Sequence, residues 1–225
     1  MKAFVLAAGK GERLRSIWKL PKILFPVKGK SLLAHQSVFL NSSPEIEESS
    51  CIISWGRKEI DQEIARGGFD MKVCEVPLSD TGTELATATE RLGKDEDILV
   101  LNGDTLTNIN LSAFINAHRV SKLPASIALV RWENIAEYGE VVVEGDRAVG
   151  FREKSGEKRL GLVNAGVYIL KAGLLKNLKA SASLERDVFP NLAKERKLHA
   201  FLHDGYMFDM GTPDRIEVER DFFER

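Results

Sequence analysis

Short apolar runs alternate with stretches of helical periodicity along the first half of the chain. Residues 3–8 form a continuous apolar run, which is typical of a strand buried on both faces of a sheet, and further strands are expected at residues 51–55, 71–76 and 97–101. Apolar side chains at helical spacing occupy the intervening residues 31–40, 58–66 and 83–92. Ser31 is a candidate N-cap of the first helix, and Gly67 and Gly68 end the second. The alternation predicts an α/β fold with a mostly parallel sheet and helices on both faces.

The second half of the chain is richer in strand patterns. Strands are expected at residues 125–131, 139–144, 148–152 and 162–170, and helices at residues 184–196 and 213–223. A Gly145–Asp146 turn separates the second and third of these strands. No Pro- or Ser-rich linker, repeat or low-complexity segment divides the sequence. We therefore expect one domain over residues 1–225, in which both halves share a sheet and the second half adds a lid for a second substrate.

The composition is that of an ordinary globular protein, and it narrows the function classes. Of 225 residues, 44% are hydrophobic and 29% are charged, which argues against disorder and against a fibrous protein. Lys and Arg number 32 against 33 Asp and Glu, so the chain lacks the basic excess expected of a nucleic-acid-binding protein. A local basic pocket for a small anion is compatible with this balance.

Cysteine usage and the N-terminal sequence predict a cytoplasmic protein. Cys51 and Cys74 form no Cys-x-x-Cys pair, and we interpret both as reduced core residues, although spacing alone leaves a disulfide open. The apolar stretch at residues 3–8 is too short for a signal peptide and is followed by a charged glycine loop. No run approaches the length of a membrane span.

The glycine loop after the first strand predicts a phosphate site. Residues 6–14 read LAAGKGERL, where glycines let backbone N–H groups approach a phosphate and Arg13 can bind phosphate oxygens with its planar fork. A dinucleotide-binding fingerprint would need glycine in place of Leu14, and a Walker A loop would need glycine in place of Leu24, so both matches fail. A plain turn is the alternative. Lys22 lies between two prolines and can reach the same phosphates from the other side.

The later motifs, taken in order, resemble those of the sugar-1-phosphate nucleotidyltransferases. After the glycine loop come residues 21–27 (PKILFPV), 102–104 (NGD), 138–139 (YG), 151–154 (FREK), 164–168 (NAGVY) and 208–213 (FDMGTP). The NGD segment follows a predicted parallel strand, so it belongs at the sheet edge where ligands bind. The resemblance spans residues 3 to about 215. The chain departs from the family loop at Ala8 and Glu12, where the family usually has Gly and Thr.

The resemblance implies a Rossmann-like, GT-A-like architecture with two halves, nucleotide-binding (about 1–120) and sugar-phosphate-binding (about 121–225). It implies that a sugar-1-phosphate oxygen attacks the α-phosphorus of a nucleoside triphosphate, from which pyrophosphate leaves. Because this nucleophile is already anionic, positioning and charge neutralisation suffice. No Ser-His-Asp or Cys-His arrangement is evident. We interpret the four histidines as structural residues of helices or surface segments: His35, His118, His199 and His203.

The same resemblance assigns the site residues. The catalytic residues are Arg13, Lys22 and Asp104, and the Mg²⁺ ligands are Asp104 and Asp209. The nucleotide-binding residues are Leu6, Ala8, Gly9, Gly11, Arg13, Lys22, Thr81, Gly82, Asn102 and Gly103. The sugar-phosphate-binding residues are Gly139, Glu153, Lys154 and Asn164. In the loop that faces the nucleobase, Glu84 stands where the family often has a small residue. Capping and turn roles are the alternative for Asp104 and for the start of the helix at Thr81.

The sequences at residues 183–190 and 207–213 look most like those of small guanylyltransferases. GTP with mannose 1-phosphate or D-glycero-D-manno-heptose 1-phosphate is therefore the expected substrate pair. A glucose-1-phosphate thymidylyl- or uridylyltransferase, a cytidylyltransferase for a small phosphorylated alcohol, and a catalytically inactive nucleotide-sugar-binding regulatory subunit remain alternatives. The expected partners are a nucleoside triphosphate and a sugar 1-phosphate, without nucleic acid or membrane, and the chain is expected to be a monomer or homodimer.

Overall fold

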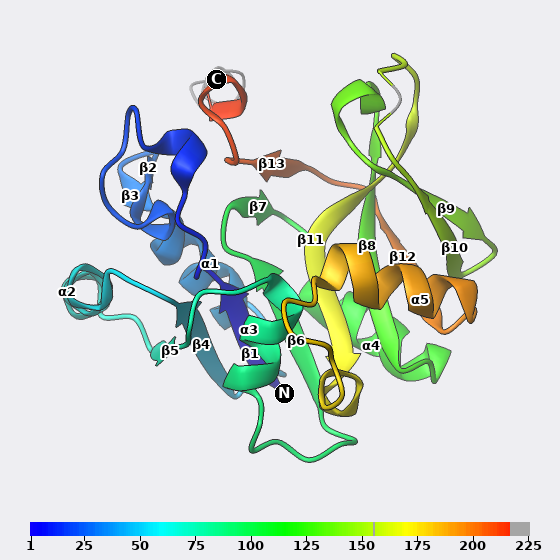
Figure 1. Ribbon diagram of the computed structural model, residues 1–225, viewed down its shortest axis with the longest axis horizontal. Helices are drawn as coiled ribbons and strands as arrows, with labels where there is room; N and C mark the ends of the chain where they lie inside the picture. Colours follow the sequence, from blue (N-terminus) through cyan, green and yellow to red (C-terminus); the bar gives the residue numbers. More distant parts are fainter. Residues whose placement is uncertain (155, 217–225) are drawn as a thin grey trace.

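A nine-stranded sheet runs through the whole protein in the computed structural model, which describes residues 1–154 and 156–216 (Figure 1). In spatial order its strands are β5 (Lys72–Glu75), β4 (Glu48–Ile53), β1 (Lys2–Leu6), β6 (Asp97–Asn102), β11 (Gly161–Lys171), β8 (Ala125–Trp132), β12 (Leu198–His203), β10 (Arg147–Arg152) and β9 (Glu140–Glu144). The first four are parallel neighbours, and so are β8 and β12. Strand β11 is antiparallel to both β6 and β8. The predicted α/β class with a mixed sheet is confirmed.

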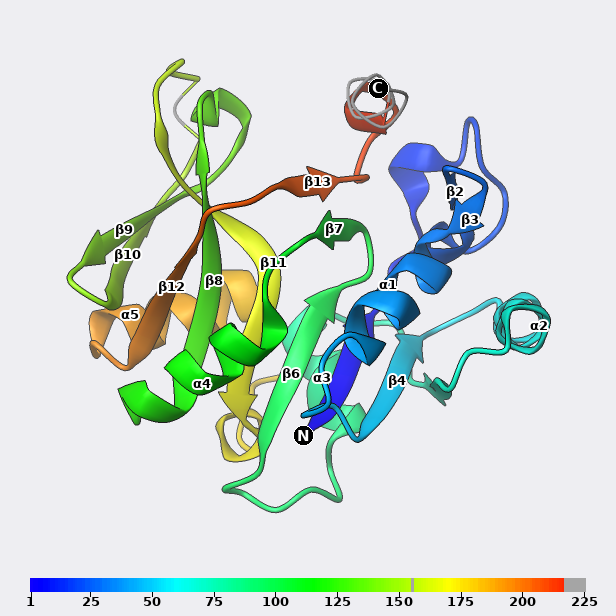
Figure 2. The same cartoon turned by 180° about the vertical axis from the view of Figure 1, so that it is seen from behind.

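Helices cover both faces of the sheet, as the alternating pattern predicts. Helices α1 (Leu32–Asn41) and α4 (Leu111–Ser121) pack on one face, and α3 (Thr81–Ala88) and α5 (Phe189–Lys194) on the other (Figures 1 and 2). Helix α2 (Arg57–Gly67) lies beyond the β4–β5 edge and buries Ile60. None of the described helices is long and apolar enough to cross a membrane.

Local sequence explains where these helices begin and end. The Ser31 hydroxyl accepts a hydrogen bond from the Ala34 N–H at 3.1 Å, which confirms the predicted N-cap of α1. Helix α2 stops where Gly68 adopts a left-handed conformation with φ 64°. The helix predicted over residues 184–196 is interrupted: a π-helical turn at Leu184–Val188 precedes α5. Pro190 has no N–H to donate, and its ring would clash with a carbonyl one turn earlier, so the α-helix starts anew beside it.

Some elements escape the sequence prediction. Helix α4 and strand β12 were not expected, and α3 ends at Ala88 rather than near residue 92. His199 lies in β12 and is buried, so placing it in a helix or surface segment was wrong. Strand β12 pairs on both sides, with β8 and β10, and this tertiary pairing defines the strand. The helix predicted at 213–223 starts within the described chain, and residues 217–223 lie outside it.

Two short pairings matter for the site. Strands β2 (Pro26–Val27) and β3 (Lys30–Ser31) form a small hairpin after the predicted phosphate loop. Strand β7 (Thr105–Thr107) pairs antiparallel with β13 (Met207–Asp209), so that Asp209 lies opposite Thr105. A segment near the C-terminus is thereby brought beside the end of β6. Cys51 and Cys74 are free thiols on the neighbouring strands β4 and β5, as the sequence predicts.

Candidate active site

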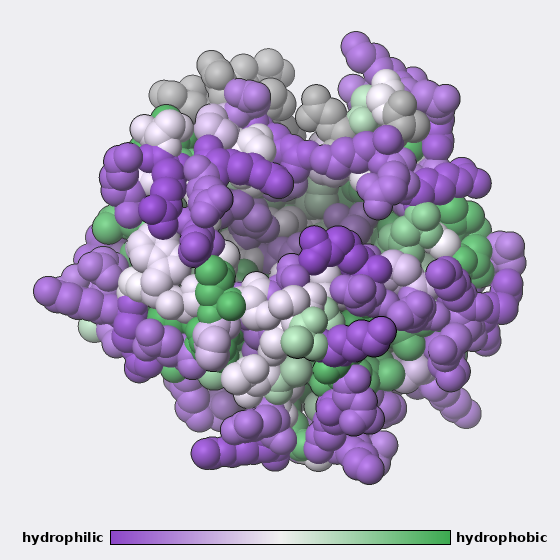
Figure 3. Space-filling view, viewed as in Figure 1, coloured by the Kyte–Doolittle hydropathy of each residue, from purple (hydrophilic) through white to green (hydrophobic). Residues whose placement is uncertain are grey.

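A cleft of about 820 Å³ opens where β1 and β6 end. The surface is visibly hollowed between the two halves, with hydrophilic side chains around the opening (Figure 3). Its walls come from the glycine loop, the turn after it, the start of α3, the end of β6 and the β13 region. The lining residues are Leu6, Ala7, Ala8, Gly9, Lys10, Gly11, Glu12, Arg13, Lys22, Ile23, Leu78, Ser79, Asp80, Thr81, Glu84, Asn102, Gly103, Asp104, Glu185, Asp209, Gly211 and Arg215. The cleft lies at the carboxyl ends of the strands, as predicted for this sheet type.

The glycine loop forms one wall of this cleft. Its N-terminal part is anchored by the Ser54 hydroxyl, which donates to the Ala8 carbonyl at 2.5 Å. Gly11 adopts a left-handed conformation with φ 63°, which a side chain would strain, and leads into the single turn that carries Arg13. Arg13 is exposed and has no ion-pair partner among residues 1–154 and 156–216. Its guanidinium is therefore available to an anionic ligand. Glu12, the preceding residue, is also exposed.

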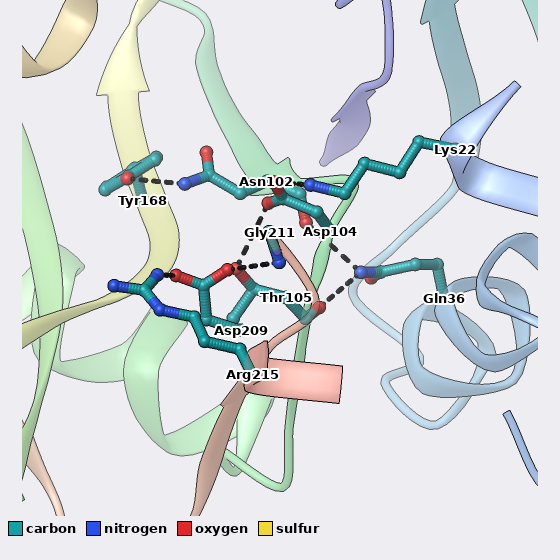
Figure 4. Close-up of polar contacts among 9 residues, drawn as sticks. All are labelled: Lys22, Gln36, Asn102, Asp104, Thr105, Tyr168, Asp209, Gly211 and Arg215. Atoms are coloured by element: carbon teal, nitrogen blue, oxygen red, sulfur yellow. Dashed lines mark hydrogen bonds and ion pairs between the residues drawn. The ribbon is translucent and has the colours of Figure 1, made fainter. Parts of the chain in front are cut away.

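The end of β6 approaches β1 so closely that only glycine fits. The Gly103 N–H donates to the Leu6 carbonyl at 2.9 Å, and a Cβ atom on Gly103 would lie 2.6 Å from that same oxygen. From the neighbouring helix α1, the buried Gln36 amide donates to the Asn102 and Thr105 carbonyls at 3.2 and 2.6 Å. These bonds fix the backbone on both sides of Asp104 (Figure 4).

Lys22 and Asp104 meet in the cleft although they are 82 positions apart in the sequence. The Lys22 Nζ donates to Asp104 Oδ2 at 2.6 Å. The lysine extends from a short helical turn that follows Pro21, and its side chain is 17% exposed against 37% for the aspartate. The structure therefore joins the predicted phosphate-binding lysine to the predicted metal ligand.

Asp209 joins the same group from β13. The Gly211 N–H donates to its Oδ1 at 2.7 Å, and the Arg215 guanidinium forms an ion pair with its Oδ2. The Met210 N–H donates to the Asp104 carbonyl at 2.8 Å, which holds the two segments together. Burial, and secondly the negative charge of Asp104, raise the pKa of Asp209, and Arg215 opposes that shift.

The two carboxylates fit a magnesium ion that shares its ligands with a substrate. Mg²⁺ is usually bound by one or two carboxylates, with phosphate oxygens and waters completing its shell. Asp104 and Asp209 both line the cleft and are close enough for one to raise the pKa of the other. Across the described chain, no group of three or more His, Cys, Asp or Glu residues forms a metal cage. This arrangement suits a metal that arrives with a triphosphate.

The predicted sugar-phosphate residues lie outside the cleft lining. Glu153 and Lys154 are exposed just after β10, and Gly139 is exposed before β9. The Asn164 amide donates to the Tyr168 hydroxyl at 2.7 Å, and its Oδ1 accepts from the Gly166 N–H. Two contacts link this region to the cleft. The amide of the cleft residue Asn102 donates to the same Tyr168 hydroxyl at 3.3 Å, and the Arg215 guanidinium lies 4.6 Å from the ring centre of Tyr138, next to Gly139.

Thr81 and Gly82 have different positions at the start of α3. Thr81 lines the cleft, and its hydroxyl donates to Glu185 at 2.9 Å. Gly82 is buried away from the cleft lining, where its N–H donates to the Ala182 carbonyl. A Cβ atom on Gly82 would lie 2.8 Å from that oxygen, so the glycine allows α3 to approach the 180s segment. A nucleotide role for Gly82 stays a prediction.

Three residues of the site were missed in the sequence. No local sequence pattern marks these residues, which are Gln36, Glu185 and Arg215. The first two contact partners 66 or more positions away, and Arg215 reaches the site through the path of β13. None of the four histidines lines the cleft. His35 contacts the Val27 carbonyl and His203 contacts Asn108.

Comparison with known proteins decides the family. The family profile described as "Nucleotidyl transferase" matches residues 2–224. The chain belongs to the nucleotidyl transferase family. This nucleotidyltransferase is 30% identical over 223 residues to D-glycero-alpha-D-manno-heptose 1-phosphate guanylyltransferase from Aneurinibacillus thermoaerophilus, covering 95% of the chain and 94% of the relative. It is also 30% identical to mannose-1-phosphate guanylyltransferase from Mycobacterium tuberculosis, with 94% of the chain covering 61% of that relative. The family resemblance and the enzyme class expected from the sequence are confirmed.

Solved structures show the same fold for this nucleotidyltransferase. HddC from Yersinia pseudotuberculosis complexed with GMP-PN matches with a TM-score of 0.82 at 20% identity, covering 99% of both chains. A putative glucose-1-phosphate thymidylyltransferase from Bacillus anthracis, in complex with a sucrose, matches with a TM-score of 0.84 at 20% identity, covering 99% of this chain and 95% of that one. These matches confirm the expected GT-A-like architecture.

Proposed function

We propose that the enzyme transfers the guanylyl group of GTP to the phosphate of a mannose or heptose 1-phosphate and releases pyrophosphate. The Lys22–Asp104 ion pair, with Asp209 beside it in a cleft walled by the glycine loop, is the observation that carries this proposal. The nucleotide and sugar follow the names of the two guanylyltransferase relatives, of which the heptose enzyme has nearly the same length as this chain.

The reaction needs positioning and charge neutralisation more than proton transfer. An oxygen of the sugar phosphate forms a bond to the α-phosphorus, and the bond from that phosphorus to the bridging oxygen of pyrophosphate breaks. The attacking oxygen is already anionic, so no general base is required. The cleft lining contains no histidine or cysteine, and its cationic residues are Lys10, Arg13, Lys22 and Arg215.

Each part of the cleft has a role in this proposal. Backbone N–H groups around Gly9 and Gly11, together with Arg13, bind the triphosphate. Lys22 neutralises charge on the departing pyrophosphate, which is greatest in the transition state. Asp104 and Asp209 hold Mg²⁺, which, when bound, neutralises triphosphate oxygens. Beyond the cleft lining, the proposal assigns the sugar phosphate to Gly139, Glu153, Lys154 and Asn164, so that residues 1–120 handle the nucleotide and residues 121–225 the sugar.

A catalytically inactive nucleotide-sugar-binding subunit is disfavoured by the intact cleft. Arg13, Lys22, Asp104 and Asp209 all line it together. We further propose a cytoplasmic enzyme, monomeric or homodimeric, in keeping with its free thiols.

A substrate matrix tests the proposal. Pyrophosphate release is measured with each of five nucleoside triphosphates against mannose 1-phosphate, D-glycero-D-manno-heptose 1-phosphate and glucose 1-phosphate, with Mg²⁺ and with EDTA as the control. GTP with a manno-configured sugar should give the highest kcat/KM. A maximum with dTTP or UTP and glucose 1-phosphate would replace the proposed substrates, and binding without pyrophosphate release would favour the inactive subunit.

A further inference from the structure

The first turn of α3 presents a nearly buried carboxylate to the cleft. Glu84 lines the cleft together with Ser79, Asp80 and Thr81, yet the residue is only 4% exposed. Carboxylates are almost never buried to this extent without a partner.

Only one oxygen of this carboxylate is occupied. Glu84 Oε1 accepts a hydrogen bond from the Ser79 N–H at 3.0 Å. This bond spans the start of the helix and fixes the position of the side chain. Glu84 Oε2 has no partner among the described residues. No fully buried side-chain oxygen or nitrogen in the described chain lacks a hydrogen bond, so Oε2 must be open to the cleft. A fixed acceptor therefore faces the space where a ligand would lie.

The two walls of the cleft differ in their charged residues. The glycine-loop side, where phosphates bind in the proposed function, carries Lys10, Arg13 and Lys22 together with Glu12, and Lys22 is paired with Asp104. The α3 side carries three carboxylates: Asp80, Glu84 and Glu185. Asp80 is neutralised by Arg186 at 2.8 Å, and Glu185 accepts the hydroxyls of Thr81 and Ser183. Glu84 has neither a cation nor a hydroxyl, so it is the acceptor that still needs a donor from the ligand.

Guanine is the base that meets this need. Its N1–H and 2-amino group are adjacent donors on one edge, whereas adenine, cytosine, uracil and thymine place an acceptor beside each ring or amino donor. An ionised carboxylate only accepts hydrogen bonds, so it pairs with two donors and repels an acceptor. We propose that Glu84 reads the guanine base by accepting its N1–H and 2-amino donors. This inference rests on the proposed function and names the residue that selects its nucleotide.

Base analogues and two Glu84 variants test this assignment. ITP lacks the 2-amino group, and XTP carries an acceptor oxygen there. Wild-type enzyme should use GTP with a kcat/KM about 10- to 100-fold above that for ITP, the range expected for a hydrogen bond to a charged group. The loss should fall on the apparent KM of the nucleotide and leave kcat nearly unchanged, because the base is bound equally in ground and transition states.

The Glu84→Gln variant should invert the preference. The glutamine oxygen can still accept from Ser79 or N1–H, while its amide donates to the 2-oxygen of xanthine and conflicts with the 2-amino group of guanine. The variant should therefore favour XTP over GTP, and Glu84→Ala should use GTP and ITP equally. Asp80→Asn is the matched control: it removes a charge at the same end of the cleft and should keep the wild-type GTP to ITP ratio. Thermal unfolding of every variant reports whether the helix start survives.

The outcomes separate this inference from the proposed function. If wild-type enzyme uses GTP but Glu84→Gln, still folded, keeps the same preference for GTP over ITP and XTP, the inference is wrong and the proposed function stands. If the Glu84→Gln variant does not fold, the wild-type comparison of GTP with ITP remains as the test. Equal use of GTP and ITP by the wild-type enzyme also overturns the inference. If wild type does not use GTP, both fall.

Discussion

Two acidic side chains in the cleft each form an ion pair with a cationic side chain. Lys22 pairs with Asp104, and Arg215 pairs with Asp209. If Asp104 and Asp209 hold Mg²⁺, as proposed, the ion would compete with Lys22 and Arg215 for their oxygens, and both cations would become more available to phosphate groups. Without a ligand, the two ion pairs balance charge in a partly buried site. This exchange makes each of these residues a separate target for mutation.

Asp104→Asn should lower kcat by roughly 10²-fold or more while the protein still folds. In the proposed function the change removes a charged metal ligand beside the departing pyrophosphate, a loss on the order of 3 kcal/mol. Turnover in Mg²⁺ and thermal unfolding are measured together. Asp70→Asn, an exposed residue preceding β5 at the opposite sheet edge, is the control and should behave as wild type. Near-normal turnover of Asp104→Asn would remove Asp104 from the site.

Lys22→Ala and Lys154→Ala should fail in different ways. Lys22 neutralises charge that develops as pyrophosphate departs, so its loss should depress turnover even at saturating substrates. If Lys154 holds the sugar phosphate, Lys154→Ala should mainly raise the apparent KM for the sugar 1-phosphate, and Glu153→Ala should behave likewise. Steady-state kinetics with each substrate varied separately distinguishes the two classes. A Lys154→Ala variant impaired only toward the triphosphate would disprove the assignment of the second half to the sugar.

At the residue scale, the sequence predicts the motif residues that line the cleft better than it predicts the residues that contact them. The glycine loop, Lys22 and Asp104 follow from local motifs, because each motif lies at the end of a recognisable strand or next to proline. Arg215 and Gln36 act through contacts set by β13 and α1, and no spacing in the sequence encodes these contacts.

At the scale of elements, the close approach of β6 to β1 positions the catalytic aspartate. Gly103→Ala should lower the free energy of unfolding by about 1–3 kcal/mol, the usual cost of overpacking, and should also reduce activity by shifting Asp104. The added Cβ would lie 2.6 Å from the Leu6 carbonyl, which is backbone and cannot rotate away.

Urea unfolding of Gly103→Ala and a matched variant measures this effect. Gly150→Ala is the control, since its Cβ would lie 3.9 Å from the nearest atom, an ordinary contact on strand β10. Equal stability of the two variants would show that the β1–β6 approach is not tight.

The sequence predicts helices and strands well where buried positions leave a clear apolar pattern, and poorly where a strand forms only because it pairs with another strand. Strands β1, β4 and β6 each contain an apolar run, and β5 is expected within residues 71–76 although it includes Lys72 and Glu75. Helix α4 was overlooked although Leu111, Phe114 and Ile115 have helical spacing and Asn110 caps it through the Ala113 N–H. Strand β13 is three residues long and exists because it pairs with β7, which the sequence cannot show.

At the scale of the whole molecule, a buried polar network links the two halves. The Ser126 hydroxyl of β8 lies 2.8 Å from His118 Nδ1 on α4 and 3.1 Å from His199 Nδ1 on β12. His118 Nε2 lies 3.5 Å from Asp97, which also pairs with Lys171. Burial is the main cause of a lowered pKa for both histidines, although Asp97 opposes it for His118 and Asp146 for His199.

These histidines should make the protein less stable in mild acid. Because their folded-state pKa values lie below the ordinary value of about 6.5, the unfolded chain binds more protons below that pH. Their contribution to stability is complete above about pH 6.5 and decreases as the pH falls through that value. Urea unfolding near pH 7.5 and pH 5.5 measures the decrease, which His118→Asn/His199→Asn should reduce. An unchanged pH dependence in that variant would contradict the network's role.

In the proposed reaction, this cleft transfers a nucleotidyl group by breaking the bond between the α- and β-phosphates of the nucleoside triphosphate. Phosphorus NMR of the enzyme with GTP, Mg²⁺ and mannose 1-phosphate or D-glycero-D-manno-heptose 1-phosphate observes the bond directly. With at least one of the two sugars, resonances of pyrophosphate and of a sugar-linked diphosphate should appear in equal amounts as those of GTP and the sugar phosphate disappear. Release of GDP and inorganic phosphate, or unchanged spectra with both sugars, would contradict the proposed reaction.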